Sequence, residues 1–88
     1  MRIIVYVRLE TLIPLLMKKG WTQAILAGRI GVSDWYVSMV INRKMSPSPK
    51  VQSRILEAFK GMSVEPGGRL SWDRLFRTEL VDTNGTHI

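Results

Sequence analysis

The chain has 88 residues, 45% of them hydrophobic, and a formal net charge of +6. This length and apolar content suit one small domain with a single core and exclude a wholly disordered chain. Because the sequence contains no cysteine, disulfide bonds and thiolate metal sites are excluded too. The charge is unevenly placed, since residues 18–60 hold eight Lys or Arg and two acids, whereas the other residues hold five of each. This localisation favours a polyanionic partner.

Residues 2–9, RIIVYVRL, form a β-branched run that is compatible with a short strand. Its apolar part, residues 3–7, and the next apolar stretch, residues 12–17, are both much shorter than the ~20 residues that a membrane span needs. No small-residue cleavage site of a signal peptide follows either stretch. We therefore expect a cytoplasmic protein with no membrane partner.

The first helix is expected at residues 12–19, with Thr11 as its cap and Gly20 at its end. Pro14 falls in its first turn, where the missing backbone N–H costs little. The pattern therefore predicts a short helix directly after the strand-like segment.

The second expected helix, QAILAGRI over residues 23–30, follows a cap at Thr22 and carries apolar residues at helical spacing. Gly31 ends it, in the left-handed conformation that glycine adopts at low cost. Ser33 then caps a third helix over about residues 34–42. Two short helices separated by a glycine turn are thus predicted.

The remaining elements follow two loops. After RKMSPSP, Ser48 caps a fourth helix that has Pro49 at its first position and is closed by Gly61. After VEPGGR, Ser71 caps a short helix, WDRLFRTEL, and residues 81–88 are expected to form a flexible tail.

The two helices around Gly31 meet the requirements of a tight helix pair. Ala27 is small where the two helices cross most closely, and Gly31 makes the turn. The apolar residues that fill the wedge between the pair and the core are Leu26, Ile30, Val32, Val37 and Val40. Because all seven positions are satisfied together, this pattern is more specific than a lone glycine turn.

This spacing resembles the helix-turn-helix of the phage-repressor and Cro type, the Xre-like family. The segment TQAILAGRIGVSDWYVSMVINRKMSPS carries the resemblance, with one helix before it and the SPKVQSRILEAF helix after it. SWDRLF also resembles a closing helix of that family. The resemblance implies a mainly α, lambda-repressor-like bundle of about five short helices, with the short N-terminal strand added. The resulting domain covers residues 1–80, with an extended segment at 1–10 and a helical core at 11–78.

The third helix has one face that points away from the core. At 100° per residue, Val37, Val40 and Ile41 lie on one side of the helix and define the direction of the core. Side chains near the opposite direction are expected to point to solvent. The side chains that point away are those of Trp35, Met39 and Asn42. Trp35 is therefore predicted to be displayed and not buried.

By resemblance, this face reads base edges in the major groove of double-stranded DNA. Asp34, Trp35 and Met39 take the base-reading positions, while Gln23 contacts the backbone at the start of its helix. Asn42, Arg43 and Lys44 grip the opposite side, Lys50 assists them, and Tyr36 donates its hydroxyl to a phosphate. The expected DNA-binding residues are Gln23, Ser33, Asp34, Trp35, Tyr36, Ser38, Met39, Asn42, Arg43 and Lys44.

We expect a small transcriptional regulator, a repressor or Cro-like protein, that acts as a homodimer on a palindromic operator. No catalytic or metal site and no cofactor are expected, because His87 near the C-terminus is the only histidine and no phosphate-binding glycine loop follows a strand. Two alternatives remain open. One is an antitoxin or anti-repressor that uses the same fold to bind a protein; for Trp35 itself, the alternative to DNA contact is packing against a dimer mate or a partner protein. The other is a LacI-type headpiece, although there the motif starts at the N-terminus.

Overall fold

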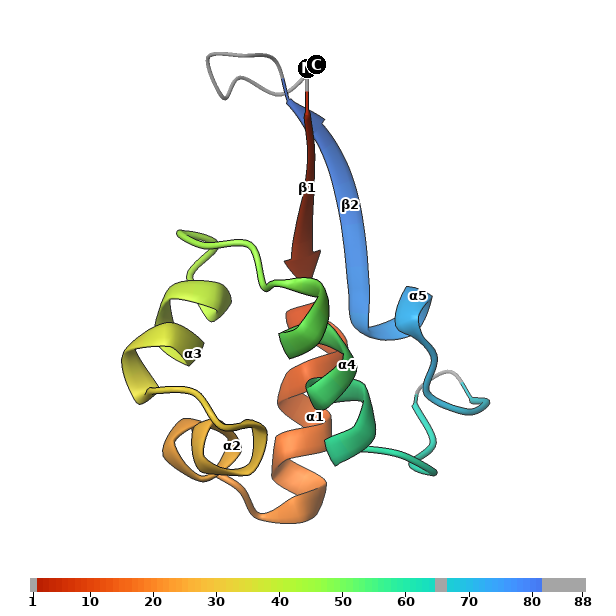
Figure 1. Cartoon of the computed structure of the whole chain (residues 1–88). Helices are drawn as coiled ribbons and strands as arrows, with labels where there is room; N and C mark the ends of the chain where they lie inside the picture. The colour runs from red at the N-terminus through yellow and green to blue at the C-terminus, as the bar shows by residue number, and fades with distance from the viewer. Residues whose placement is uncertain (1, 65–66, 82–88) are drawn as a thin grey trace.

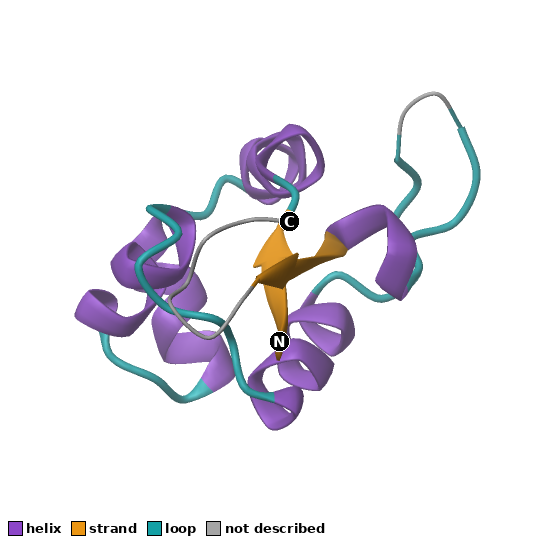
Figure 2. Ribbon diagram, turned by 90° about the horizontal axis from the view of Figure 1, so that it is seen from above, coloured by secondary structure: helices purple, strands orange, loops and turns teal. Residues whose placement is uncertain are grey.

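The computed structural model describes residues 2–64 and 67–81. Within these residues the elements are β1 (Arg2–Val7), α1 (Leu9–Lys19), α2 (Gln23–Ile30), α3 (Asp34–Ile41), α4 (Pro49–Ala58), α5 (Trp72–Leu75) and β2 (Phe76–Val81). Figure 1 shows a cluster of helices from which a ribbon of β1 and β2 projects, and Figure 2 looks down on this ribbon and shows helices around its base. The prediction of a mainly α bundle of about five short helices with a short N-terminal strand is confirmed.

The predicted caps set the starts of three helices. The side chains of Thr22, Ser33 and Ser48 each accept a hydrogen bond from the backbone N–H three residues further on, at the starts of α2, α3 and α4. Gly31 ends α2 in the left-handed conformation, with φ 74°. Pro49 is the first residue of α4, which ends at Ala58 and does not run on to Gly61.

Helix α1 begins three residues earlier than its sequence predicts. It starts at Leu9 and not at Leu12, so Thr11 lies in its first turn and does not cap it. Pro14 accordingly lies inside the helix, on an exposed side, and not in the first turn. The residue at the cap position is Arg8, whose side chain makes no capping hydrogen bond.

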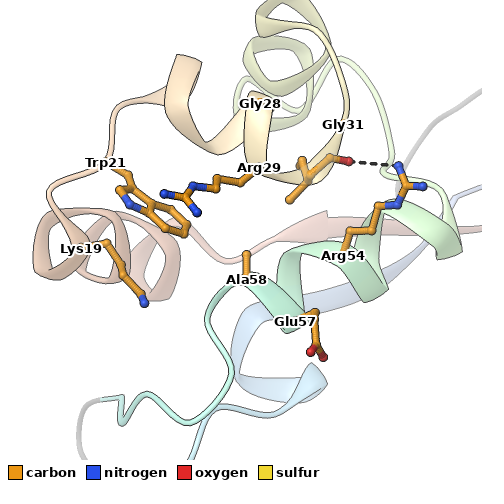
Figure 3. Close-up of a pocket in the computed structure, with 9 residues that line it drawn as sticks. Lys19, Trp21, Gly28, Arg29, Gly31, Arg54, Glu57 and Ala58 are labelled. Atoms are coloured by element: carbon orange, nitrogen blue, oxygen red, sulfur yellow. Dashed lines mark hydrogen bonds between the residues drawn. The ribbon is translucent and has the colours of Figure 1, made fainter.

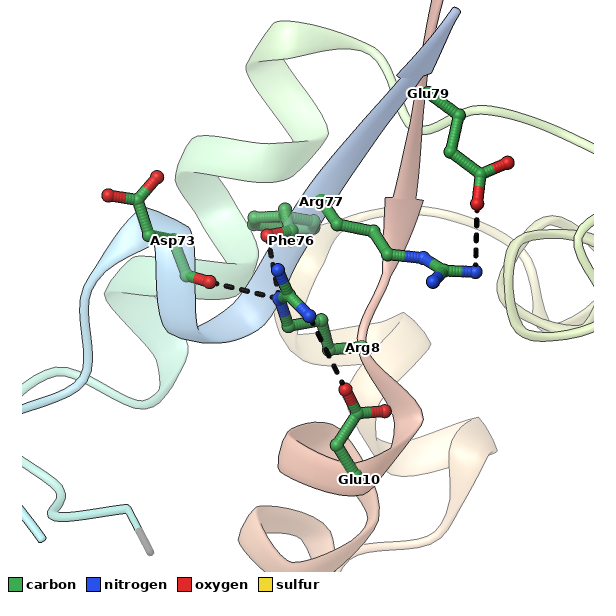
Figure 4. A network of polar contacts seen from close by, with 6 residues as sticks. All are labelled: Arg8, Glu10, Asp73, Phe76, Arg77 and Glu79. Atoms are coloured by element: carbon green, nitrogen blue, oxygen red, sulfur yellow. Dashed lines mark hydrogen bonds and ion pairs between the residues drawn. The ribbon is translucent and has the colours of Figure 1, made fainter. Parts of the chain in front are cut away.

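Arg8 fixes this early start through contacts with the far end of the chain. Its backbone N–H donates to the carbonyl oxygen of Leu75 at 2.7 Å. Its Nε donates to the carbonyl oxygens of Asp73 at 3.0 Å and Phe76 at 3.1 Å (Figure 4). Because these bonds hold Arg8 in extended backbone, the helix begins directly after it, and no local cap signal is needed.

The segment WDRLFRTEL is only partly helical, which corrects the sequence prediction. Helix α5 stops at Leu75, and Phe76–Val81 is a strand that pairs antiparallel with β1, with Val7 opposite Phe76 and Arg2 opposite Val81. The pairing satisfies backbone groups that β1 would otherwise leave open, and it outweighs the local helical pattern. Val81, the first residue of the predicted tail, is instead the buried last residue of β2, and residues 82–88 lie outside the described residues.

The core joins all five helices and the base of the ribbon. Phe59 and Leu75 are fully buried, and Trp21 packs on the Phe59 ring with centroids 5.5 Å apart. Among the predicted wedge residues, Leu26, Ala27, Ile30, Val37 and Val40 are buried, and Val32 is half-buried. No single described helix is long and apolar enough to cross a membrane, although α2 and α3 pass that test when taken together across their bend.

Candidate nucleic-acid interface

Helices α2 and α3 form a tight angular pair around Gly31. They meet at 112°, within the range of helix-turn-helix units. The N–H of Val32 donates to the carbonyl oxygen of Ala27 at 3.0 Å, and Nη1 of Arg54 donates to the carbonyl oxygen of Ile30 at 3.1 Å. These bonds satisfy the last carbonyls of α2 and fix the direction in which α3 leaves the turn.

Helix α3 has a buried face and an exposed face, as its periodicity predicts. Val37 and Val40 are buried, whereas the Trp35 side chain is 62% exposed. Asn42 is exposed, and Met39 and Ser38 are half-buried at the edge of the open face. The helix therefore presents an indole and a thioether to the outside, on a backbone that the core holds in place.

The starts of α2 and α3 carry the remaining polar residues of the predicted set. Gln23 is the first residue of α2 and is exposed, as Asp34 is at the start of α3. The Oγ of Ser33 accepts a hydrogen bond from the N–H of Tyr36 at 3.1 Å, so this hydroxyl has a capping role. Its proton stays available for donation, because capping uses the oxygen only as an acceptor.

The hydroxyl group of Tyr36 has a structural role that the sequence did not reveal. Its ring is half-buried against the core, and its hydroxyl oxygen accepts a hydrogen bond from the N–H of Ser48 at 3.2 Å. This bond joins α3 to the cap of α4. The predicted donation of the hydroxyl proton to a phosphate is compatible with it and stays a prediction.

The C-terminal end of α3 adopts a Schellman motif with an arginine at its turning point. The N–H of Arg43 donates to the carbonyl oxygen of Val40 at 3.2 Å, and the N–H of Lys44 donates to that of Met39 at 2.9 Å. Arg43 is the one described residue other than glycine with a positive φ, 59°. A side chain in this conformation costs about 1–2 kcal/mol, so glycine is the usual residue there.

The Arg43 side chain lies against the ribbon. Its guanidinium is 5.4 Å from the centre of the Tyr6 ring in β1, and the guanidinium of Arg77 in β2 is 5.9 Å from the same ring. Asn42 turns back, and its Nδ2 donates to the Oγ of Ser38 at 3.3 Å. Tyr6 and Arg77 are absent from the predicted site, because only the pairing of the chain's two ends brings them to the end of α3.

A second cationic area lies where the C-terminal ends of α1 and α2 face α4. An open hollow of about 520 Å³ is lined by Lys19, Trp21, Arg29, Arg54 and Glu57, among others (Figure 3). Lys19 and Arg29 lie 5.4 and 5.1 Å from the Trp21 ring, and Arg54 is bonded to the end of α2. Lys19, Arg29 and Arg54 thus each have a partner within the domain. Among the described residues there is no cluster of three or more His, Cys, Asp or Glu that would hold a metal.

Comparison with protein families matches residues 15–65 to a family described as helix-turn-helix. The match covers more than half of the 88 residues and includes α2, the turn, α3 and α4. Searches of curated proteins and of solved structures gave no match.

Proposed function

The chain belongs to the helix-turn-helix family of the Cro/C1 or Xre-like type, a family of DNA-binding domains in transcriptional regulators, and on this premise we propose that it binds a specific double-stranded DNA sequence. It acts as a small regulator of the repressor or Cro-like kind. It carries out no catalysis and needs no metal or cofactor.

The observation that carries this proposal is the exposure of Trp35 on α3. Trp35 is 62% exposed and is not among the residues packed against the core, while Val37 and Val40 on the same helix are buried. In a helix-turn-helix, the second helix of the pair lies in the major groove with its N-terminal residues at the base edges. Trp35 is the second residue of that helix, which supports its assignment to base reading.

Three side chains of α3 are assigned to base reading. Trp35 and Met39 offer apolar contact to thymine methyl groups, and the Asp34 carboxylate accepts a hydrogen bond from the cytosine amino group. Ser33 and Ser38 lie beside them at the edge of the same face. This set favours an operator in which thymine and cytosine occur at the contacted positions.

The polar residues around the pair are assigned to the phosphate backbone. Gln23 lies at the N-terminus of α2, where free backbone N–H groups also favour an anion. Asn42, Arg43 and Lys44 follow α3 and hold the backbone at its other end, with Tyr36 and Lys50 on the same side. The excess of positive charge within residues 18–60 supports this assignment, since phosphate contacts supply most of the sequence-independent affinity.

We infer a homodimer on a palindromic operator, formed through the outer edge of β2. Ile3 and Leu80 face each other across the ribbon, and their side chains are 66% and 48% exposed. Within the described residues no strand pairs with the other edge of β2. An exposed edge with apolar side chains is a natural pairing surface for a second copy. On a palindromic operator, the two α3 helices of such a dimer would have to reach half-sites about 34 Å apart.

Selection of bound duplexes from a random pool tests the proposed function. We expect enrichment of one palindromic sequence and an affinity that falls steeply with salt, as about 4 to 6 phosphate contacts per dimer require. Recovery of unenriched sequences would contradict specific binding.

The alternative from another class is an antitoxin or anti-repressor that binds a protein through the same fold. The apolar character of Trp35 is the observation in its favour, because an exposed tryptophan also suits a protein interface. Binding through such a surface would be nearly independent of salt, whereas phosphate binding would not.

A further inference from the structure

We propose that the strand ribbon carries an additional phosphate-binding site, so that the DNA interface extends beyond the helix-turn-helix onto β1. This inference rests on the proposed function, since the phosphate is one of the same DNA that α3 reads. The site is an open groove of about 390 Å³ between β1 and the loop after α3, called here the ribbon groove. It is lined by Arg2, Ile3, Ile4, Tyr6, Arg43, Lys44, Met45 and Ser46.

The ribbon groove is rich in cations, and none of them takes part in an ion pair within the described residues. Arg2, Arg43 and Lys44 line it, and none of its lining residues is acidic. Among the described residues, ion pairs join Arg8 to Glu10 and Arg77 to Glu79, so none uses the three cations of the groove. Figure 4 shows the second of these pairs along β2. The groove therefore has positive charge to offer an anion.

Its two walls are held together by direct bonds. The Oγ of Ser46 donates to the carbonyl oxygen of Val5 at 3.0 Å and accepts from the N–H of Val5 at 3.2 Å. Ser46 thus closes the edge of β1 at Val5 and fixes the loop against the strand. Because the loop continues directly from α3, the groove keeps a constant position relative to the recognition helix.

Arg43 is oriented for this role by its backbone and by Tyr6. It occupies the left-handed position at the end of α3, where glycine would be less strained, and this conformation directs the guanidinium to the Tyr6 ring at 5.4 Å. A guanidinium that lies over a ring keeps its N–H groups free at the edge and loses little further side-chain freedom on binding. Bidentate donation to a phosphate is the interaction that such a geometry favours.

The groove suits a backbone phosphate better than an unstacked base. Binding of single strands depends on open aromatic faces on which bases stack. The groove offers one ring, Tyr6, which is half-buried and already lies near two guanidinium groups. All charged groups of the groove are cationic, so the duplex backbone is the partner that the groove fits.

The position of the groove extends the interface in one direction. Figure 1 shows the ribbon rising past the loop that follows α3, away from α2. A phosphate in the groove lies beyond the C-terminal end of α3, whereas Gln23 contacts the backbone at the start of α2. The ribbon therefore lengthens the contacted stretch of duplex in one direction, beyond the C-terminal end of α3.

The test compares Arg2→Gln with the matched control Arg69→Gln, because both remove one exposed arginine but Arg69 lies outside the groove. Binding to the selected operator is measured by fluorescence anisotropy as a function of salt, with a melting curve to verify folding. We expect Arg2→Gln to weaken binding about 3- to 10-fold and to lower the salt slope by about one for each protomer, and Arg69→Gln to change neither. The same comparison is repeated on operators that are shortened from their ends by one base pair at a time. The affinity difference between wild type and Arg2→Gln should disappear at the length at which the phosphate bound by the groove is removed.

Equal affinity and salt slope for wild type and Arg2→Gln on the full operator would overturn the ribbon groove and leave the proposed function intact. A wild-type protein that binds no duplex would overturn both. An equal loss for Arg2→Gln and Arg69→Gln would also overturn the groove, because it would trace the effect to net charge alone.

Discussion

Gly31 and Arg54 are in close contact at the turn between α2 and α3. A methyl group added at Gly31 would lie 3.0 Å from Nη1 of Arg54, the same nitrogen that donates to the carbonyl oxygen of Ile30. The turn is therefore restricted twice, by its φ of 74° and by a side chain that already bonds the end of α2.

Gly31→Ala should destabilise the domain, and Gly28→Ala should not. The first change forces a side chain into a left-handed conformation and against Arg54, which costs about 1–3 kcal/mol in the free energy of unfolding. Gly28 lies within α2 with nothing near its added methyl, so alanine there should stabilise by about 0.5–1 kcal/mol. Chemical denaturation of both variants checks this, and equal stabilities would contradict the account of the turn.

Trp35→Ala should change which operator is preferred while the fold persists. Loss of the exposed indole should reduce affinity for the wild-type operator about 5- to 100-fold, in the range of one lost base contact. The control is Trp21→Ala, which removes a ring packed on Phe59 and should destabilise by at least about 2 kcal/mol. Duplex selection and thermal melting distinguish the two. Unfolding of the Trp35 variant would show that this side chain belongs to the core.

Arg43→Gly should weaken DNA binding without loss of stability. Glycine relieves about 1–2 kcal/mol of backbone strain, which offsets the loss of about 0.5–1 kcal/mol from the contact with Tyr6. Affinity should fall to a similar extent for operator and random duplex, because a phosphate contact carries no sequence information. Anisotropy titrations on both duplexes measure this effect. A fall confined to the operator would instead indicate base reading by Arg43.

Leu80→Glu should convert a dimer into monomers. The added carboxylate would place a charge on β2, through whose outer edge two copies are proposed to meet. Met17→Glu is the matched control, since Met17 is 75% exposed on α1 and lies outside the ribbon. Sedimentation equilibrium of the three proteins gives the oligomeric state. A monomeric wild type, or dissociation by both variants alike, would exclude this interface.

The local part of the fold was predictable from the sequence. Caps such as Thr22 and Ser33 and the turn at Gly31 depend on neighbours within a few residues, and the structure has them where the sequence places them. Periodicity likewise separates the buried Val37 from the exposed Trp35. The exposed position of the proposed base-reading face therefore follows from local rules, while its contacts with DNA stay predictions.

The larger missed features depend on contacts between distant segments, whereas the end of α4 and the turn at Arg43 are local. Nothing near Phe76 signals a strand, because its partner is β1 at the other end of the chain. Arg8 starts α1 through bonds to the segment around α5, not through a cap of its own. Tyr6 enters the proposed interface for the same reason, since only the assembled ribbon brings it to the end of α3.

The pairing of β1 with β2 also has a kinetic consequence. The two strands are separated in sequence by all five helices, so their pairing closes almost the whole described chain into one loop. The entropy of that closure opposes ribbon formation until the helical core has brought the strands together, which makes the ribbon a late step of folding. A chain that is still folding therefore lacks both the dimer edge and the ribbon groove. Tight operator binding would then be restricted to completely folded molecules.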